Sequence, residues 1–331
     1  MNAVLIIDKP AGLTSHDVVN RVRRILNQRS VGHLGTLDPM ATGVLPLVVG
    51  SFTRLAQFYT TSEKTYEGTI RFGFSTDTFD AEGEPTSPPQ DVTLQKHEIE
   101  TIAATFRGVI EQLPPPFSAK KIQGVPAYKL ARKHKEVVLQ PVQVEIKEFE
   151  ILSVDAARVH FRARVASGTY MRSVAHDMGK ALGCGAHLES LRRTSVAEFT
   201  LEDAHTLDAL AAAAGQSAPC GAVVPDSLCG SGAHARPADR APNTVVTLEA
   251  LDSLCVHPRK LLPHFPSVTA DDPTANRIRA GRTVNLPELS RARQVKVFAG
   301  QRDLIAIATR VAGSLFHPKL VLCASDTRVH S

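Results

Sequence analysis

The sequence contains no tryptophan, and aromatic residues make up 5% of the chain. Broad surfaces that stack on bases are therefore not expected. No stretch approaches the ~20 apolar residues that a membrane-spanning helix needs. The N-terminal MNAVLIIDKP has a short apolar run before Asp8 and lacks the basic region and long apolar core of a signal peptide. These absences predict a cytoplasmic protein that does not interact with membranes.

Cysteine is also scarce: the chain has 5, an odd number, and no C-x-x-C pair. A disulfide framework is therefore not expected, and a reducing compartment fits better. Cys184 and His187 have the C-x-x-H spacing of half a zinc site, but the sequence offers no second half. We therefore expect a structural cysteine and no metal site.

The composition is otherwise that of a globular protein, with 43% hydrophobic and 21% charged residues. A length of 331 residues suggests about two domains. The formal net charge is +5, which is compatible with a nucleic-acid partner but does not identify one.

The stretch VGHLGTLDPMATGVLPLVVG, residues 31–50, is almost entirely apolar or glycine, yet it holds one carboxylate, Asp38. Because Asp38 precedes Pro39, its backbone favours extended or turn geometry, and a turn cap is one interpretation of its side chain. The other is an ionised acid in an apolar pocket, which needs a partner charge such as that of Arg172. The glycines would let another group, such as a second chain, approach the backbone closely.

Hydrophobic patterning predicts the elements around this stretch. Residues 3–8 form a short apolar run typical of a buried strand. Thr14 and Asp17 have the spacing of a capping box at the start of a helix. Apolar residues alternate over 66–72, which predicts another strand.

The second half of the chain divides into three parts. A strand over 160–165 is followed by a turn and by a helix that begins near Tyr170. A segment rich in Ala, Gly, Ser and Pro then predicts a flexible insertion at about 210–244. The strand-like runs near the C-terminus indicate a small β-rich domain, and they are 294–300, 303–311 and 318–324.

Two segments are basic. The helix after Asp17 carries arginines away from its apolar face, as either a solvated stripe or a stripe that faces RNA. The segment 113–137 follows prolines and mixes aromatic with basic residues, and it is either a nucleic-acid clamp or a solvated loop and helix. The candidate RNA-binding residues in these segments are Arg21, Arg24, Lys120, Lys121, Arg132 and Lys133.

The loop TDTFDAEGEP holds two acids, Asp77 and Asp80. Their D-x-x-D spacing suggests a metal site, but further acidic ligands are missing. Turn capping by aspartate is the better interpretation.

Several motifs together resemble one family, the bacterial tRNA pseudouridine-55 synthases of the TruB type. GHLGTLDPMATGVL at 32–45 resembles the family's catalytic motif, and LIIDKPAGLTSHDVV at 5–19 its N-terminal motif. The other matches are K-x-Y at 64–66, SGTYMRS at 167–173 and Leu-Arg-Arg at 191–193. The order and spacing also agree, over about residues 1–208.

The resemblance implies catalytic roles for three residues. Asp38 matches the catalytic aspartate, and Arg172 matches the arginine that pairs with it. Tyr66 matches the tyrosine that lies against the target base and handles a proton.

Further matches imply contacts with the substrate. His33 matches a histidine that fills the space left by the extruded uridine, and Leu191 matches a leucine in the pocket wall. Arg54 stands where the family has a basic residue near the substrate. Tyr170, at the predicted helix start, and Lys9, in the N-terminal motif, complete this set.

The resemblance also implies an α/β (α+β) fold with a mixed, largely antiparallel sheet. It predicts a catalytic domain at 1–265 with an RNA-clamping thumb at 113–140. A PUA-like RNA-binding domain follows at 266–331. The insertion at 210–244 is longer than the family usually has there.

The implied reaction turns uridine 55 in the T-loop of tRNA into pseudouridine. It breaks the C1′–N1 bond, turns the uracil and joins C1′ to C5, with no net redox change, so no cofactor is expected. The implied partner is the T-arm stem-loop of tRNA. The thumb favours a monomer that needs neither a guide RNA nor a protein partner.

Two other functions stay open from the sequence. One is a tRNA-binding or tRNA-folding protein whose catalysis is secondary. The other is an N-glycosidase in which water captures C1′ and free uracil is released.

Overall fold

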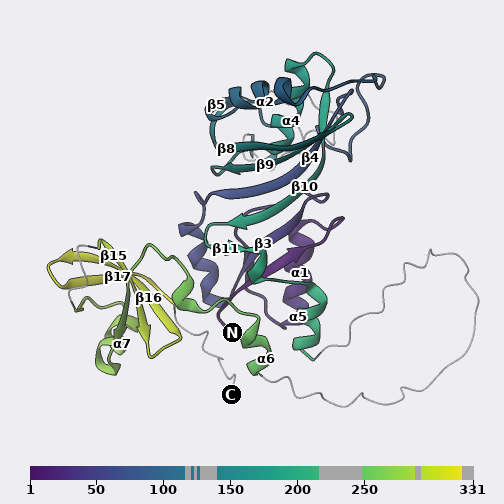
Figure 1. Ribbon diagram of the computed structural model, residues 1–331. Helices are drawn as coiled ribbons and strands as arrows, with labels where there is room; N and C mark the ends of the chain where they lie inside the picture. The colour runs from purple at the N-terminus through teal and green to yellow at the C-terminus, as the bar shows by residue number, and fades with distance from the viewer. Residues whose placement is uncertain (116–120, 123–124, 127–139, 216–247, 288–291, 323–331) are drawn as a thin grey trace, which may run out of the picture.

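The computed structural model of the protein describes residues 1–115, 121–122, 125–126, 140–215, 248–287 and 292–322, with side chains left out at 121–122, 125–126 and 248–249. Two sheets dominate the described chain. A large sheet forms the body, and a smaller sheet lies beside the lower end of the body in the view of Figure 1.

The large sheet has ten strands, of which eight follow the order β12-β1-β3-β10-β4-β9-β8-β5. β2 pairs with β3, and β11 pairs with β10. Most neighbours are antiparallel, while β1 with β12 and β10 with β3 run parallel. The expected fold class, with a mixed and largely antiparallel sheet, is therefore confirmed.

The strands of the large sheet come from most of the described chain. Their bounds are β1 Ala3–Lys9, β2 Val31–His33, β3 Thr42–Val49, β4 Lys64–Phe72, β5 Gly108–Gln112, β8 Val142–Asp155, β9 Arg158–Val165, β10 Ala186–Val196, β11 Phe199–Thr200 and β12 Ala204–His205.

Helices cover this sheet, with α1 and α5 in contact at one end and α2 and α4 in contact at the other (Figure 1). Their bounds are α1 Ser15–Ile25, α2 Lys96–Thr105, α4 Met171–Ala181, α5 Leu207–Ala213 and α6 Leu248–Ser253. The 3-10 segments are η1 Gly50–Phe58, η2 Leu201–Asp203 and η3 Pro258–Lys260.

The smaller sheet has five strands in the order β13-β15-β16-β17-β14 and packs against one helix, α7. Three of its strands are the C-terminal runs predicted from the sequence. The bounds are β13 Ser267–Ala270, α7 Asp272–Arg279, β14 Val284–Asn285, β15 Gln294–Ala299, β16 Asp303–Ala312 and β17 Leu315–Val321.

Local sequence explains the elements that carry the site. The Thr14 side chain caps α1 by accepting from the Asp17 backbone N–H at 3.0 Å, while Asp17 accepts from the Thr14 backbone N–H at 2.9 Å. This is the predicted capping box. In β4 the predicted apolar face is buried, with Tyr66, Ile70 and Phe72 each at most 7% exposed.

One hydrophobic cluster joins the two sheets. Side chains of β1, β3 and η1 pack with Leu261, Leu262 and strands β15, β16 and β17. A separate cluster lies between the large sheet and its helices. The smaller sheet is therefore held against strand β3, which follows Asp38 in the chain, by a continuous apolar core.

Much of the predicted thumb lies outside the described residues. Within 113–140 the structure describes 113–115, the two-stranded pair β6 Lys121–Ile122 and β7 Val125–Pro126, and Gln140. Of the predicted insertion it describes only 210–215, and the domain limits at 265 and 266 stay predictions. In the described part of the chain, no helix is long and apolar enough to cross a membrane.

Candidate active site

A cavity of about 420 Å³ opens beside the large sheet, within the size range of ligand pockets. Five segments line it: the end of β2 with the loop before β3, the end of η1, the start of β4, the turn before α4 with the first residues of α4, and β10. Among the lining residues are His33, Asp38, Lys64, Tyr66, Tyr170, Arg172 and Leu191.

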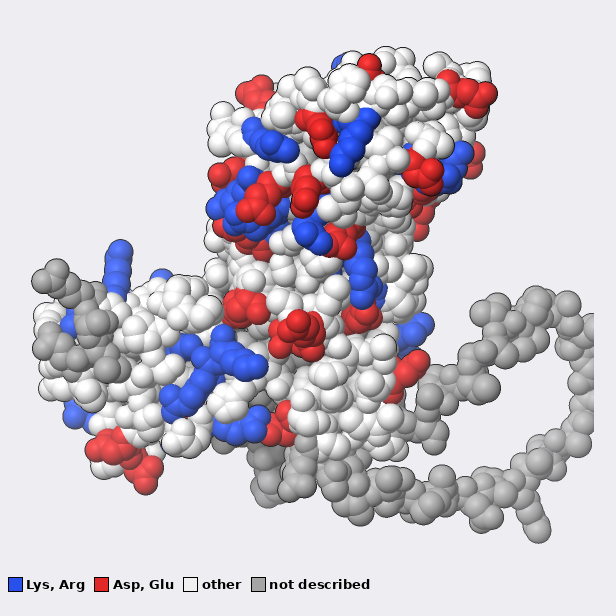
Figure 2. Space-filling view, in the orientation of Figure 1, with Lys and Arg blue, Asp and Glu red and all other residues white. Residues whose placement is uncertain are grey.

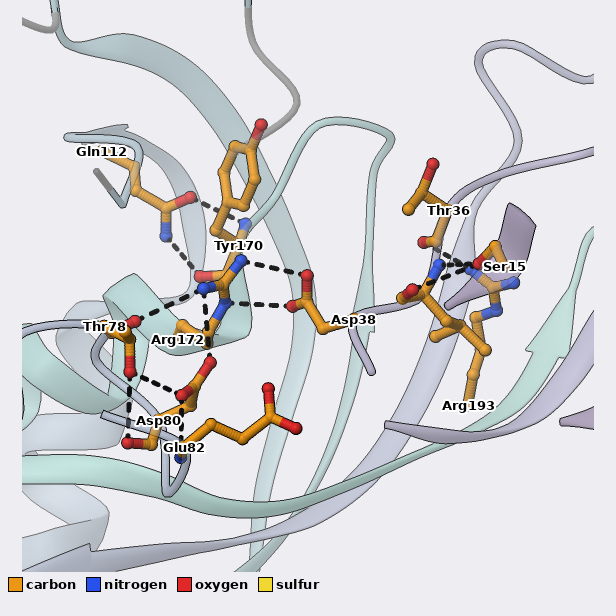
Figure 3. A network of polar contacts seen from close by, with 11 residues as sticks. Ser15, Thr36, Asp38, Thr78, Asp80, Glu82, Gln112, Tyr170, Arg172 and Arg193 are labelled. Atoms are coloured by element: carbon orange, nitrogen blue, oxygen red, sulfur yellow. Dashed lines mark hydrogen bonds and ion pairs between the residues drawn. The ribbon is translucent and has the colours of Figure 1, made fainter. Parts of the chain in front are cut away.

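Asp38 and Arg172 meet in this cavity as a two-point ion pair (Figure 3). Arg172 Nη2 donates to Asp38 Oδ1 at 3.0 Å, and Arg172 Nε lies 2.9 Å from Oδ2. The Arg172 side chain is 6% exposed, whereas Asp38 keeps 35% of its side-chain surface accessible. The arginine is thus part of the wall, and the carboxylate faces the cavity.

A second carboxylate, Asp80, holds the other side of Arg172. Its Oδ2 lies 3.3 Å from Arg172 Nη1, and Asp80 is almost fully buried. The same Nη1 donates to the Thr78 carbonyl at 3.3 Å. Asp80 also caps its own loop, because its Oδ1 accepts from the Thr78 hydroxyl and the Glu82 N–H.

The sequence interpretation of Asp80 as a turn cap was therefore incomplete. The Asp80 carboxylate caps its own loop and also contacts Arg172. Only the contact with Arg172 connects Asp80 to the site. The signal in the sequence was weak, since a D-x-x-D loop gives no indication that an arginine 92 positions later folds over it.

Burial raises the pKa of Asp38 above the usual range of an aspartate. The Arg172 guanidinium acts against this rise, while the charge of Asp80 adds to it. An isolated carboxylate in this place would favour the neutral form, and Arg172 supplies the charge that opposes protonation.

The backbone around Asp38 is held from three directions. The Ser15 hydroxyl both accepts from Leu37 N–H at 2.8 Å and donates to Leu37 C=O at 3.1 Å. On the other side of Asp38, the Pro39 carbonyl accepts from Lys9 Nζ at 3.0 Å and from Gly12 N–H at 2.9 Å. Asp38 therefore sits in a fixed turn.

Lys9 does not line the cavity, contrary to its predicted place among the substrate-binding residues. It is fully buried, and its ammonium donates to the carbonyls of Pro10 and Pro39. Burial lowers the pKa of Lys9 to about 8, although the charge of Asp38 raises it. Its position supports the Asp38 turn from behind.

Arg193 fastens the same loop from β10. Its guanidinium donates to the carbonyls of Gly35 at 3.1 Å, Thr36 at 3.3 Å and Val44 at 2.8 Å, and the residue is fully buried. Gly43 has φ +99°, and a Cβ there would collide with the Arg193 backbone. Gly43 therefore allows β3 and β10 of the same chain to lie close together. The sequence had suggested instead that the glycines admit a second chain.

Four more of the predicted site residues, Tyr66, Leu191, Tyr170 and His33, line the cavity. Tyr66 and Leu191 form buried wall, at 7% and 8% exposure. Tyr170 is the N-cap of α4 and exchanges two backbone hydrogen bonds with the Gln112 amide. Burial, together with the charges of Arg193 and His16, lowers the pKa of His33, which favours a neutral ring at pH 7.

Arg54 is not at the cavity. It is exposed on η1, and its Nη1 donates to the Val321 carbonyl of β17 at 2.7 Å. It therefore ties the body to the smaller sheet. Arg21 and Arg24 are exposed on α1. Lys120, Arg132 and Lys133 lie outside the described residues, and Lys121 is described only as part of β6.

Within the described ranges, no group of three or more His, Cys, Asp or Glu side chains is placed to hold a metal. Cys184 donates weakly to the Gly185 carbonyl, and the His187 ring contacts the Phe74 carbonyl and ring. The chemistry that the site offers is that of one accessible carboxylate whose ionised form is supported by an arginine.

Comparison with known proteins shows the family of this chain. Residues 23–171 match the TruB family pseudouridylate synthase N-terminal domain, and residues 172–220 match the tRNA pseudouridylate synthase B C-terminal domain. The tRNA pseudouridine synthase B of Solibacter usitatus (strain Ellin6076) is 46% identical over 325 residues, which is 97% of this chain and all of the relative. That of Azoarcus sp. (strain BH72) is 36% identical over 97% of this chain and 95% of the relative.

Solved structures share the fold. Cbf5 in the archaeal box H/ACA sRNP Nop10–Cbf5 complex aligns with a TM-score of 0.63 and 24% identity, over 98% of this chain and 87% of that one. A Cbf5–Nop10–Gar1 complex aligns with a TM-score of 0.66 and 24% identity, over 98% and 86%. With both family models matched and relatives 46% and 36% identical over 97% of the chain, this chain belongs to the TruB family of pseudouridylate synthases, which are isomerases.

Proposed function

We propose that this enzyme converts uridine 55 in the T-loop of tRNA to pseudouridine. The observation that carries the proposal is the Asp38–Arg172 ion pair, which presents one carboxylate to a cavity large enough for a nucleotide. The curated relatives are named tRNA pseudouridine synthase B, and this supports tRNA as the substrate.

Asp38 acts on the ribose. As the C1′–N1 bond breaks, positive character develops at C1′, and a carboxylate beside the sugar stabilises it. Asp38 either attacks C1′ as N1 leaves, and is itself displaced when C5 bonds to C1′, or it takes a proton from C2′ as N1 leaves and returns it to C2′ when the C5–C1′ bond forms. Both routes require the ionised acid. The uracil turns, C5 bonds to C1′, the proton on C5 is lost, and N1 ends protonated. Atoms and electrons balance without a cofactor.

Tyr66 and Leu191 act on the base. Both are buried in the cavity wall, where the tyrosine ring offers a flat face for the uracil and its hydroxyl handles the C5 proton. The apolar side chain of Leu191 excludes water, which would otherwise capture C1′.

The target nucleotide must leave its stack, which costs a few kcal/mol in base-modifying enzymes. His33, which lines the cavity and whose lowered pKa favours a neutral ring, fills the vacated space in the loop. Arg21, Arg24 and the thumb basic residues contact phosphates. Figure 2 shows a further group of Lys and Arg where the smaller sheet meets the body, a place suited to the rest of the tRNA.

The enzyme works alone in this proposal, as a monomer in the cytoplasm where its tRNA substrate is found. The thumb takes the place of a guide RNA by clamping the stem-loop. The five-stranded part serves as a PUA-like domain for RNA.

The direct test is to incubate the purified protein with an unmodified T-arm stem-loop and map pseudouridine by position. We expect one modified position, the uridine that corresponds to 55, and no free uracil. Modification at another position would overturn the assigned site, and release of uracil would identify an N-glycosidase. Protein that binds and refolds tRNA but never modifies it would favour the tRNA-folding function.

A further inference from the structure

The loop that grips Arg172 has an unusual backbone. Phe79 lies between Thr78 and Asp80, the two residues that contact Arg172, and it has φ +64°. Left-handed backbone is costly for a residue with a bulky side chain. Some other contact must therefore hold this loop in place.

An aromatic stack provides that contact. The Phe79 ring lies on the His176 ring with centroids 3.8 Å apart and planes 18° apart. His176 follows Arg172 by four positions on α4, so the two side chains lie on the same face of the helix. The helix that carries Arg172 thus also holds the loop whose carbonyl and carboxylate orient Arg172.

The far side of the loop is pinned to β10. Leu188 N–H donates to the Phe79 carbonyl at 3.0 Å, and the Leu188 carbonyl accepts from Ala81 N–H at 3.0 Å. β10 also carries Leu191, which lines the cavity. Phe79 is therefore fixed through its backbone to one wall of the site and through its ring to another.

The His176 ring is used for packing. Its Nδ1 is buried and has no hydrogen-bond partner among the described residues. Burial lowers the pKa of His176, which favours the neutral ring. A buried polar atom without a partner is unfavourable, and the compensating contact that the structure offers is the stack on Phe79.

We propose that His176 is a positioning residue for the isomerisation. Its stack on Phe79 keeps the Thr78 carbonyl and the Asp80 carboxylate against Arg172, and so aims the guanidinium at Asp38. This inference deepens the proposed function and rests on it. If His176 served only core packing, its loss would change stability without a specific effect on turnover.

The kinetic test uses His176→Ala and His176→Phe with the T-arm stem-loop. We expect His176→Ala to lower kcat about ten-fold, with KM within about two-fold of wild type, because misplacement of a catalytic group affects the chemical step. His176→Phe keeps an apolar ring and stays within about three-fold of the wild-type kcat. Lys180→Ala, an exposed change on the same helix, is the matched control and leaves both constants unchanged.

A second variant separates the ring from the backbone strain. Phe79→Gly removes the stack and relieves the left-handed backbone, so kcat falls as in His176→Ala while thermal stability is retained. The double variant is no slower than either single one. Wild-type kcat in His176→Ala, or a His176→Phe enzyme as slow as His176→Ala, would overturn the proposal.

A thermal-unfolding cycle over His176→Ala and Phe79→Ala makes the test independent of turnover. The two effects on the melting temperature should be non-additive, which shows that the rings stabilise each other. Additive effects would refute the stack. Failure of the wild-type enzyme to modify the stem-loop would instead count against the proposed function, so the two failures are distinguishable.

Discussion

Two arginines, Arg172 and Arg193, are buried on either side of Asp38 and do different work. Arg172 pairs with two carboxylates, those of Asp38 and Asp80. Arg193 donates to three backbone carbonyls, and in the described chain no ion pair links it to a carboxylate. The guanidinium group thus supplies a positive charge at Arg172 and a rigid set of hydrogen-bond donors at Arg193.

The difference separates chemistry from scaffolding. Arg172 opposes the rise in the pKa of Asp38 that burial causes, so its removal should affect turnover most. Arg193 fixes the backbone that carries Asp38, so its removal should affect stability most. The charge of Arg193 also acts on Lys64, a residue of the cavity wall. Burial of Lys64 is the main cause that lowers its pKa to about 8, and the nearby Arg193 charge lowers it further.

Among the changes that compare the two arginines and their partners, Arg172→Met should have the largest effect on turnover. We expect kcat for the T-arm stem-loop to fall about 10²–10³-fold, because Asp38 loses the group that orients and ionises it. Binding of tRNA, measured by filter retention, should stay within about three-fold of wild type, since Arg172 is part of the wall. A variant that loses binding and turnover equally would show that Arg172 acts on ground-state affinity.

Arg193→Met should be the more destabilising change. Three carbonyls lose their donor, at about 1–3 kcal/mol for each buried group left unsatisfied, so we expect a loss of at least about 3 kcal/mol in the free energy of unfolding. Denaturant titration measures it. Its neighbour Arg192, whose side chain is 41% exposed and pairs with Asp8 at 2.8 Å, is the matched control.

We expect Arg192→Met to cost about 1 kcal/mol or less, as for ion pairs that stay in contact with solvent. Equal losses from the two changes would contradict the scaffold role of Arg193.

Asp80→Asn should have a smaller effect on kcat, about 10- to 100-fold. Arg172 keeps its ion pair with Asp38 but loses the ion pair with Asp80 that holds its other side. The pH profile gives a sharper test. The charge of Asp80 raises the pKa of Asp38, so Asp80→Asn lowers that pKa and moves the acid limb of kcat to lower pH.

Arg172→Met removes a contribution that lowers the pKa of Asp38 and moves the same limb to higher pH. Shifts in the same direction in the two variants would show that the limb does not report Asp38.

Local sequence was sufficient for the elements and insufficient for this network. The capping box, the alternation of β4 and the C-terminal strands could be predicted, because each depends on neighbours in the chain. Asp80 and Arg193 were missed, since their partners are remote: Arg193 binds Thr36 across 157 positions. No periodic pattern records such a contact.

The pairing of Asp38 with Arg172 was predicted only as a candidate, and the resemblance to the family made it specific. The same resemblance placed Arg54 near the substrate, whereas the structure places it against β17. Its basic character is compatible with both places. Lys9 likewise matched the N-terminal motif and was expected to bind substrate. In the structure its ammonium donates to two backbone carbonyls, so it supports the loop that carries Asp38.

The central claim is that the Asp38 carboxylate carries the reaction. The measurement that tests it most directly is the single-turnover rate of Asp38→Asn with the T-arm stem-loop, together with tRNA binding in the same preparation. The account predicts a rate lower by about 10⁴-fold or more with tRNA affinity retained. Pseudouridine formed by Asp38→Asn at a rate near that of wild type would contradict it.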